Sequence, residues 1–306
     1  MCGIIAVVRR PTTREPVDAA AVSTTLAEAR RILTGGDLSA LGRAADLLER
    51  VDTDLRGVPG LLTLRADASA TERIDAEVAG LAAEADRLES DLDDGDRALD
   101  PADLEVVNAT LVRVKDAVWA IGRDRLRAAA EVGSLAPEGA SSAGLAVLFS
   151  LHQALSAVDR LEVRGRDSAG IEVQVTGHGI GADDPVLRRA LETRGTASFT
   201  NCAVRVVGGT LVIVYKTSAE IGELGDNTAA LRAAVRDDDL LHLALRSSSV
   251  EAIVLGHTRW ASIGIISEPN AHPQCSDELD GAVRPFCTAV LNGDVDNYAD
   301  LIAADG

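Results

Sequence analysis

Hydrophobic patterning divides the chain into segments of different character. Residues 4–8 are an unbroken apolar run rich in β-branched side chains, which predicts a buried strand that holds the start of the chain in place. From about residue 17 to 132, apolar residues recur at helical spacing among Ala, Leu, Arg, Asp and Glu, which predicts a block of helices. Because strand patterns lie on both sides of this block, 17–132 is predicted to be an insertion into one domain made of 2–9 and 145–306.

Two apolar stripes within the block predict an antiparallel helical hairpin. The stripes consist of Ile74, Val78, Leu81, Ala85, Leu88 and Leu92, and of Leu104, Val107, Leu111, Val114, Val118 and Ile121. An acidic loop joins them, and Asp100-Pro101 supplies an N-cap and a first-turn proline for the second helix. A stripe of this kind is what a helix needs to bury itself, so a self-packed insert is favoured, with a partner-binding module as the alternative.

The remainder alternates helices and strands. Helices are predicted over 145–161 and 228–235, and strands over 171–175, 204–215, 253–255 and 288–291. Gly208-Gly209 makes the strand region 204–215 a hairpin, and 253–255 and 288–291 are predicted to be buried.

Composition narrows the class of protein. The 306 residues are 46% hydrophobic, 25% charged and 2% aromatic, with a net charge of −18. This is typical of a soluble, acidic, globular protein and argues against nucleic acid or an anionic membrane as the main partner. Because no apolar stretch reaches about 18 residues, no transmembrane span is predicted.

Cysteine and histidine usage points to a reducing compartment without a metal site. The four cysteines contain no CxxC pair and are too sparse for a disulfide scaffold, which favours the cytoplasm. The five histidines contain no H-x-x-x-H pair, so neither a metal nor another cofactor is predicted.

The first candidate for chemistry is Cys2, directly behind the initiator methionine. Removal of Met1 would leave a thiol and a free α-amine on one residue, which supplies a nucleophile and a base together. The alternative is an ordinary small residue at a mobile terminus, but the apolar run that follows argues that Cys2 is held in place.

Three polar, glycine-flanked turns follow apolar runs. Loops at the ends of rigid strands and helices often carry the residues of functional sites. The three turns span 164–170, 256–264 and 291–294. Arg259 and Trp260, directly after a predicted strand, favour recognition of a carboxylate against an aromatic wall. Asn292-Gly293 taken alone also fits an ordinary hairpin corner.

Together with Cys2, these segments resemble the class II glutamine amidotransferases, which have an N-terminal-nucleophile hydrolase fold. Within that family the resemblance is strongest to the glutaminase domains of the fructose-6-phosphate aminotransferases. The segments that carry it are Cys2-Gly3-Ile4, residues 161–170, residues 256–261, Asn270-Ala271-His272-Pro273, and Asn292-Gly293 with Asn297-Tyr298. The likeness covers residues 2–9 and roughly 145–306, and it leaves out the helical insertion. It implies an α+β, four-layer αββα fold that is C-terminally incomplete and carries a large helical insertion.

The resemblance implies roles for the residues that match. Cys2 would attack the side-chain amide of glutamine, with its own α-amine as base. Asn292, through its side-chain amide, and Gly293, through its backbone N–H, would form the oxyanion hole. Because such donors stabilise the transition state, losing one typically costs about 10² to 10³ in rate.

Further residues are implied to bind the substrate. Arg259 would hold the α-carboxylate of glutamine, while Trp260 and Ser262 would shape the pocket. Arg164 lies in a turn implied to pack beside the nucleophile. The chain departs from the family at Ser262-Ile263, where a Thr-His pair is usual.

Two other departures concern the length of the chain. The family binds the substrate ammonium group through an acidic residue downstream of the Asn-Gly pair, and the sequence ends at Gly306 before reaching it. The sugar-binding domains are also absent, so the expectation is the front part of a longer enzyme.

The implied activity is hydrolysis of L-glutamine to glutamate and ammonia, which would aminate a sugar phosphate, fructose 6-phosphate to glucosamine 6-phosphate. The acceptor would bind a C-terminal domain beyond this sequence, and such domains would also mediate any homo-oligomer. The alternatives are another acceptor, phosphoribosyl pyrophosphate or aspartate, and a degenerate non-enzymatic scaffold whose helical insertion binds a partner.

Overall fold

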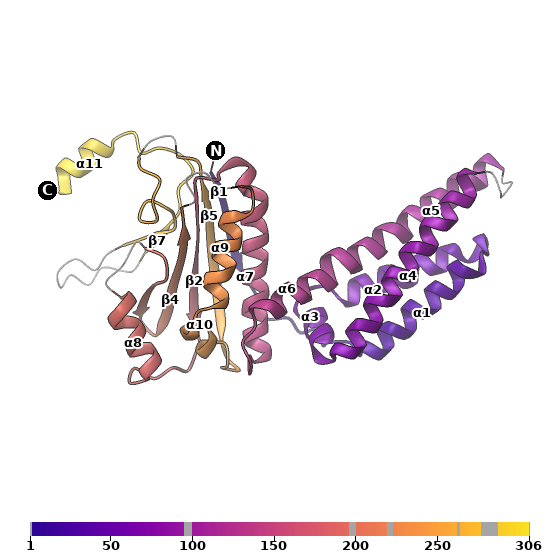
Figure 1. The fold of residues 1–306 in the computed structure, drawn as a ribbon, viewed down its shortest axis with the longest axis horizontal. Coiled ribbons are helices and arrows are strands. Elements are labelled where there is room, and N and C mark those ends of the chain that lie inside the picture. Colours follow the sequence, from indigo (N-terminus) through magenta and orange to yellow (C-terminus); the bar gives the residue numbers. More distant parts are fainter. Residues whose placement is uncertain are drawn as a thin grey trace. The chain divides into compact units, whose positions relative to one another are not determined.

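The computed structural model describes residues 2–94, 100–195, 200–218, 223–261, 264–276 and 287–305. The chain divides into two compact units, which we describe separately (Figure 1). The sheet unit comprises residues 1–10 and 135–306, and the helical unit comprises residues 11–134.

Within its described residues the helical unit contains helices and no strand. They are α1 (Ala19–Gly35), the 3₁₀ turn η1 (Leu38–Ala40), α2 (Leu41–Asp54), α3 (Gly57–Ala66), α4 (Ala68–Asp93), α5 (Pro101–Trp119), the π-helical segment η2 (Ala120–Leu126) and α6 (Arg127–Leu135). Most of the described residues in 17–132 are helical, as the spacing of apolar residues predicted.

Side-chain caps set the helix boundaries. The carboxylates of Asp18, Asp37 and Asp67 accept backbone N–H groups in the first turns of α1, η1 and α4 respectively. Gly36 ends α1 in the left-handed region, with φ of 67°, where a residue with a Cβ would be strained. Gly36 thus ends α1, and Asp37 caps the turn that follows it.

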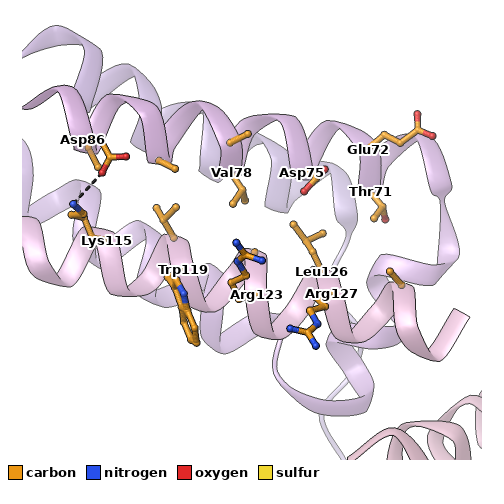
Figure 2. Close-up of a pocket in the computed structure, with 16 residues that line it drawn as sticks. Thr71, Glu72, Asp75, Val78, Asp86, Lys115, Trp119, Arg123, Leu126 and Arg127 are labelled. Atoms are coloured by element: carbon orange, nitrogen blue, oxygen red, sulfur yellow. Dashed lines mark ion pairs between the residues drawn. The ribbon is translucent and has the colours of Figure 1, made fainter. Parts of the chain in front are cut away.

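The two predicted stripes lie inside the helical unit. α4 and α5 run in opposite directions, as Figure 2 shows, while α4 also packs along α1 and α5 along α2. The buried residues include Ile74, Val78, Leu81, Ala85, Leu88 and Leu92 on α4, and Val107, Leu111, Val114, Val118 and Ile121 on α5 and η2. The stripes thus serve the packing of the unit against itself.

A five-stranded antiparallel sheet forms the centre of the sheet unit, in the order β1-β5-β2-β4-β3. The strands are β1 (Gly3–Val8), β2 (Ser168–Thr176), β3 (Ala203–Val207), β4 (Thr210–Thr217) and β5 (Glu251–Arg259). A separate two-stranded sheet pairs β6 (Gln274–Cys275) with β7 (Thr288–Ala289). The hairpin predicted at Gly208-Gly209 is confirmed, because both glycines have positive φ and join β3 to β4.

Helices cover one face of the five-stranded sheet. The sheet unit contains α7 (Ser142–Leu161), the 3₁₀ turn η3 (Glu162–Arg164), α8 (Pro185–Arg194), α9 (Asp226–Arg236), α10 (Asp239–Ala244) and α11 (Tyr298–Asp305). α7 packs on β1 and β5, and α9 packs on β2 and β4 (Figure 1). The alternate residues Ile171, Val173 and Val175 of β2 are fully buried beneath them.

The opposite face carries Glu172, Lys216 and His257 in its middle, all less than 3% exposed. Toward β1 this face is open, and Ile4 and Val8 are 44% and 69% exposed. The two faces therefore differ in chemistry, since one is apolar and helix-covered while the other buries ionisable groups.

Three sequence expectations need correction. Residues 4–8 form a strand, but β1 lies at the edge of the sheet and has helix cover on one face only, so it is not a buried central strand. In 253–255, Ile253 is 45% exposed because it shares the open face with Val8. The buried strand expected over 288–291 is reduced to the two residues of β7, of which Ala289 is exposed.

The broader expectation of a mixed fold with helices and an antiparallel sheet is confirmed. The finer four-layer αββα arrangement stays a prediction.

Candidate active site

Cys2 lies at the start of the edge strand, beside the end of β5. Gly3 is opposite Thr258, and the Gly3 N–H donates to the Thr258 hydroxyl at 3.1 Å. The half-buried Cys2 thiol lies 3.9 Å from the Trp260 carbonyl oxygen. The pairing of Gly3 with Thr258 and the contact of the thiol with Trp260 thus hold Cys2 beside the end of β5.

The end of β5 carries the predicted carboxylate-binding residues. Arg259 is half-buried, and its Nη1 donates to the Ile265 carbonyl at 3.2 Å. Trp260 is 54% exposed. Asp167 fixes this segment, because its backbone N–H donates to the Arg259 carbonyl at 3.1 Å and its carboxylate accepts the Ala261 N–H at 2.6 Å.

Arg164 ends the short turn η3, between α7 and β2. The next residue, Gly165, packs so closely on β5 that an added Cβ would lie 3.0 Å from the Thr258 hydroxyl oxygen. The turn therefore reaches the end of the sheet where Cys2 lies, while the Arg164 side chain itself is exposed.

Two histidines attach the Asn292-Gly293 turn to this end of the sheet. Leu291, the residue before the turn, donates its N–H to His272 Nδ1 at 3.2 Å. Its carbonyl oxygen lies 3.0 Å from His257 Nε2. His257 is opposite Ile4 in the sheet, two residues from Cys2. The structure thus brings the Cys2, Arg259-Trp260 and Asn292-Gly293 segments to one end of the sheet.

The hydrogen bonds at Leu291 assign both histidine tautomers. A carbonyl only accepts, so His257 carries its proton on Nε2; an N–H only donates, so Nδ1 of His272 is unprotonated. Burial, reinforced by neighbouring His272, lowers the pKa of His257 to about 4. Burial and the positive charges of Lys216 and Arg259 also lower the pKa of His272. Both rings are therefore neutral at pH 7.

A polar cluster on β2 and β4 continues this face. Glu172 accepts Thr288 Oγ1 at 2.7 Å and Gln174 Nε2 at 2.8 Å, so it ties β7 to the sheet. Burial raises the pKa of Glu172 and lowers that of Lys216 to about 8. Since burial disfavours both charges, the cluster lowers the stability of the fold unless the charged groups interact with each other or with hydrogen-bond partners.

Sequence reasoning gave no role to His257, His272 or Glu172. The two histidines do lie within the motifs that carry the family resemblance. Glu172 gave no such signal, because polar residues that alternate with Ile171, Val173 and Val175 are equally typical of a strand with one solvated face.

The structure does not describe every residue predicted for the site. Ser262, predicted to shape the pocket, and its neighbour Ile263 lie outside the described residues. In the part of the chain that is described, no cluster of three or more His, Cys, Asp or Glu side chains is arranged to hold a metal ion. None of the described helices combines the length and the hydropathy needed to cross a membrane.

One comparison with known proteins gives a partial match. The chain is 30% identical over 100 residues to the glutamine–fructose-6-phosphate aminotransferase (isomerizing) of Chlamydia pneumoniae, a stretch that covers 29% of this chain and 15% of that protein. The chain thus matches only a small part of that relative. No profile of a known protein family matches the chain, and no solved structure matches it.

Proposed function

We propose that the sheet unit is the glutaminase part of a glutamine-dependent amidotransferase, which hydrolyses L-glutamine to glutamate and ammonia. The observation that carries the proposal is the attachment of the Asn292-Gly293 turn, through Leu291 and His257, beside the strand that begins at Cys2. A nucleophile and a pair of oxyanion donors must meet at one carbonyl group for this chemistry. The partial match to an aminotransferase that uses glutamine supports the same reaction.

The first half-reaction forms a thioester. Once Met1 is removed, the α-amine of Cys2 takes the thiol proton through water, and the sulfur attacks the amide carbon of glutamine. The electron pair of the carbonyl moves to its oxygen, which accepts hydrogen bonds from the Asn292 side-chain amide and the Gly293 N–H. The carbon–nitrogen bond then breaks, and the nitrogen takes up the proton and leaves as ammonia.

The second half-reaction restores the thiol. Water attacks the γ-glutamyl thioester, with its proton passing to the Cys2 amine, and the same two donors stabilise the second oxyanion. Collapse of this intermediate releases glutamate, and the sulfur regains its proton. No other co-reactant is needed.

Substrate binding would use Arg259. Its guanidinium donates to the neutral Ile265 carbonyl. A substrate carboxylate is a stronger acceptor than a neutral carbonyl, because it carries a charge opposite to that of the guanidinium and can accept two of its N–H groups in parallel. Glutamine would therefore compete with Ile265 for Arg259, while the exposed Trp260 ring would line the apolar part of the substrate.

The acceptor of the ammonia is the second part of the proposal. We propose a sugar phosphate, fructose 6-phosphate converted to glucosamine 6-phosphate, bound by a domain beyond this sequence. Support comes from the name of the matched relative. The whole protein, supplied with glutamine, is expected to aminate fructose 6-phosphate and neither phosphoribosyl pyrophosphate nor aspartate.

The test of the glutaminase is glutamate release by the whole protein with a processed N-terminus. Cys2→Ala should abolish release, whereas Cys202→Ala, a half-buried cysteine elsewhere in the sheet unit, should retain it. A thiol-directed glutamine analogue should label Cys2 stoichiometrically, and glutamine should protect it. Failure of the whole protein to label or to release glutamate would favour the non-enzymatic scaffold instead.

A further inference from the structure

The helical unit contains a long groove that its own helices leave open. The groove has a volume of about 820 Å³ and runs between α4 and the continuous α5–η2–α6 segment (Figure 2). Its α4 wall extends from Thr71 to Asp86, and the facing wall from Lys115 to Ala130. At 1.5 Å rise per residue, each wall is about 22 Å long. We call this feature the α4–α5 groove.

Small and apolar residues make the groove suitable for a rod-shaped ligand. Ala79 and Ala82 on α4 and Gly122 on η2 all line the groove, and these short residues leave space between the helices. Val78 and Val118 add apolar surface. A length of about 22 Å and an open side fit a helix of about four turns better than a compact small molecule.

Exposed apolar side chains mark the rim. Trp119 is 61% exposed and lines the groove, although aromatic residues make up only 2% of the chain. Val112, seven residues earlier, lies on the same side of α5 beyond the end of the groove at Lys115 and is 56% exposed. Large exposed apolar groups in such a position indicate a contact surface, and tryptophan is enriched among the residues that carry binding energy.

The two walls carry opposite charges. Glu72 and Asp75 lie on α4, and Arg123 and Arg127 lie on the facing wall (Figure 2). Lys115 pairs with Asp86 at 3.0 Å and closes one end. Among the described residues, the side chains of Asp75 and Arg123 make no ion pair or hydrogen bond. The groove therefore presents an unneutralised carboxylate on one side and an unneutralised guanidinium on the other.

The facing wall also departs from regular α-helix. Residues 120–126 are π-helical, and this segment supplies Gly122 and Arg123 to the groove. π-Helical turns widen a helix locally and frequently occur at functional sites. Here the π-helical turn carries Gly122, where an added Cβ would lie 3.4 Å from Val78 Cγ1 on the facing α4 wall.

We propose that the α4–α5 groove binds an amphipathic helix of a partner protein. The partner helix has about four turns, an apolar stripe that contacts Trp119 and the alanines of α4, Lys or Arg along the edge next to Asp75, and Asp or Glu along the edge next to Arg123. If the partner helix bound in the opposite direction, its basic edge would lie next to Arg123 and its acidic edge next to Asp75. The charge pattern therefore also sets the direction in which the partner helix binds. The proposal rests on the helical unit alone and is independent of the glutaminase activity.

Net charge argues against a second copy as the occupant. Residues 11–134 contain 15 Lys and Arg against 25 Asp and Glu, a net charge of −10. Two such units repel each other, and the same charge disfavours nucleic acid and anionic lipid. A partner helix whose basic edge meets Glu72 and Asp75 is attracted instead.

The test measures binding of a synthetic peptide to the whole 306-residue chain by fluorescence anisotropy. The peptide is an amphipathic helix of about 16 residues with a leucine stripe, lysines on one edge and glutamates on the other. Its control is a scrambled peptide of the same composition without a stripe. Saturable binding of the striped peptide alone is expected.

Matched variants locate the binding site. Ala82→Gln, which fills the groove, and Trp119→Ala should each weaken binding at least about tenfold. Ala83→Gln, an exposed neighbour on α4 that does not line the groove, and Val106→Ala, an exposed valine roughly on the opposite side of α5, should bind like wild type. Circular dichroism checks that all four variants keep their helices. Equal binding of both peptides, absence of saturable binding, or wild-type affinity in Ala82→Gln and Trp119→Ala would each overturn the proposal.

Discussion

His257 and His272 hold the two backbone polar groups of one residue, Leu291, between rings whose centroids are 4.6 Å apart. One ring donates to the carbonyl and the other accepts the N–H, so the peptide on each side of Leu291 is restrained. The pair therefore sets the direction in which the chain enters the Asn292-Gly293 turn. This makes the two histidines positioning residues for the proposed oxyanion donors.

Removing either histidine contact should lower kcat more than it changes KM. In His272→Ala the Leu291 N–H loses its acceptor, and the Asn292-Gly293 donors lose part of their preorganisation. Since these donors act in the transition state, we expect kcat for glutamate release to fall by about tenfold to a hundredfold. Steady-state kinetics with glutamine measures the two constants separately.

Controls distinguish positioning from general disruption. His257→Gln retains an amide N–H donor and should keep more activity than His257→Phe, which keeps only the ring shape. His178→Phe removes a histidine that contacts the Gly209 carbonyl in the β3–β4 hairpin and should leave kcat unchanged. Equal kcat in His257→Gln and His257→Phe would refute the role given to the hydrogen bond.

The buried neutral His257 should make stability depend on pH. Its pKa is 6.5 in an ordinary environment and about 4 here, so between these values the unfolded chain binds a proton that the folded chain does not. The free energy of unfolding should therefore fall by up to about 3 kcal/mol as the pH drops from 6.5 to about 4. Below about pH 4 this contribution should no longer change. Urea unfolding at several pH values measures this slope, and in His257→Phe that part of it should be absent.

Gly170→Ala should loosen the segment that carries His272. A Cβ on Gly170 would lie 2.2 Å from the His272 carbonyl oxygen, which is a backbone atom and has no rotamer to move. We expect a loss of about 1 to 3 kcal/mol in unfolding free energy and lower glutaminase activity. In Gly181→Ala the nearest atom is a side-chain oxygen of Asp183, which rotates away, so chemical denaturation should show wild-type stability.

Asp238→Ala should destabilise the sheet unit strongly. The Asp238 carboxylate accepts Arg194 at 2.6 and 3.1 Å and the buried Tyr215 hydroxyl at 3.0 Å, and it also caps α10. Removing it deprives the Arg194 guanidinium of its carboxylate partner and the buried Tyr215 hydroxyl of its acceptor, which should cost about 3 kcal/mol. Asp237→Ala, which breaks an exposed pair with Arg236, should unfold at the same urea concentration as wild type. Similar urea midpoints for both variants would contradict this account.

Local patterns predicted the helical unit well, because its helices are built from short-range signals. The apolar stripes on α4 and α5 depend on residues within a few positions of one another. The Gly208-Gly209 hairpin is equally local. Such features follow from spacing and turn chemistry and need no knowledge of the tertiary fold.

The sheet unit was less predictable because its partners are distant in sequence. An apolar run such as 4–8 indicates a strand but not whether that strand lies at the centre or the edge of a sheet, which depends on its pairing with β5. The contacts of Leu291 with His257 and His272 span 34 and 19 residues. The proposed chemistry of the site came from motifs and stays a prediction, whereas the contacts that hold its segments together required the fold.

The pairing of β1 also determines when the proposed nucleophile takes its place during synthesis. The strand that begins beside Cys2 has β5 as its only neighbour in the described sheet, and the Gly3–Thr258 contact spans 255 residues. At translation rates of about 5 to 20 residues per second, β1 stays unpaired for roughly 10 to 50 seconds while the residues between Gly3 and Thr258 emerge. The start of the chain is thus open to methionine removal throughout that interval, before pairing with β5 restrains it.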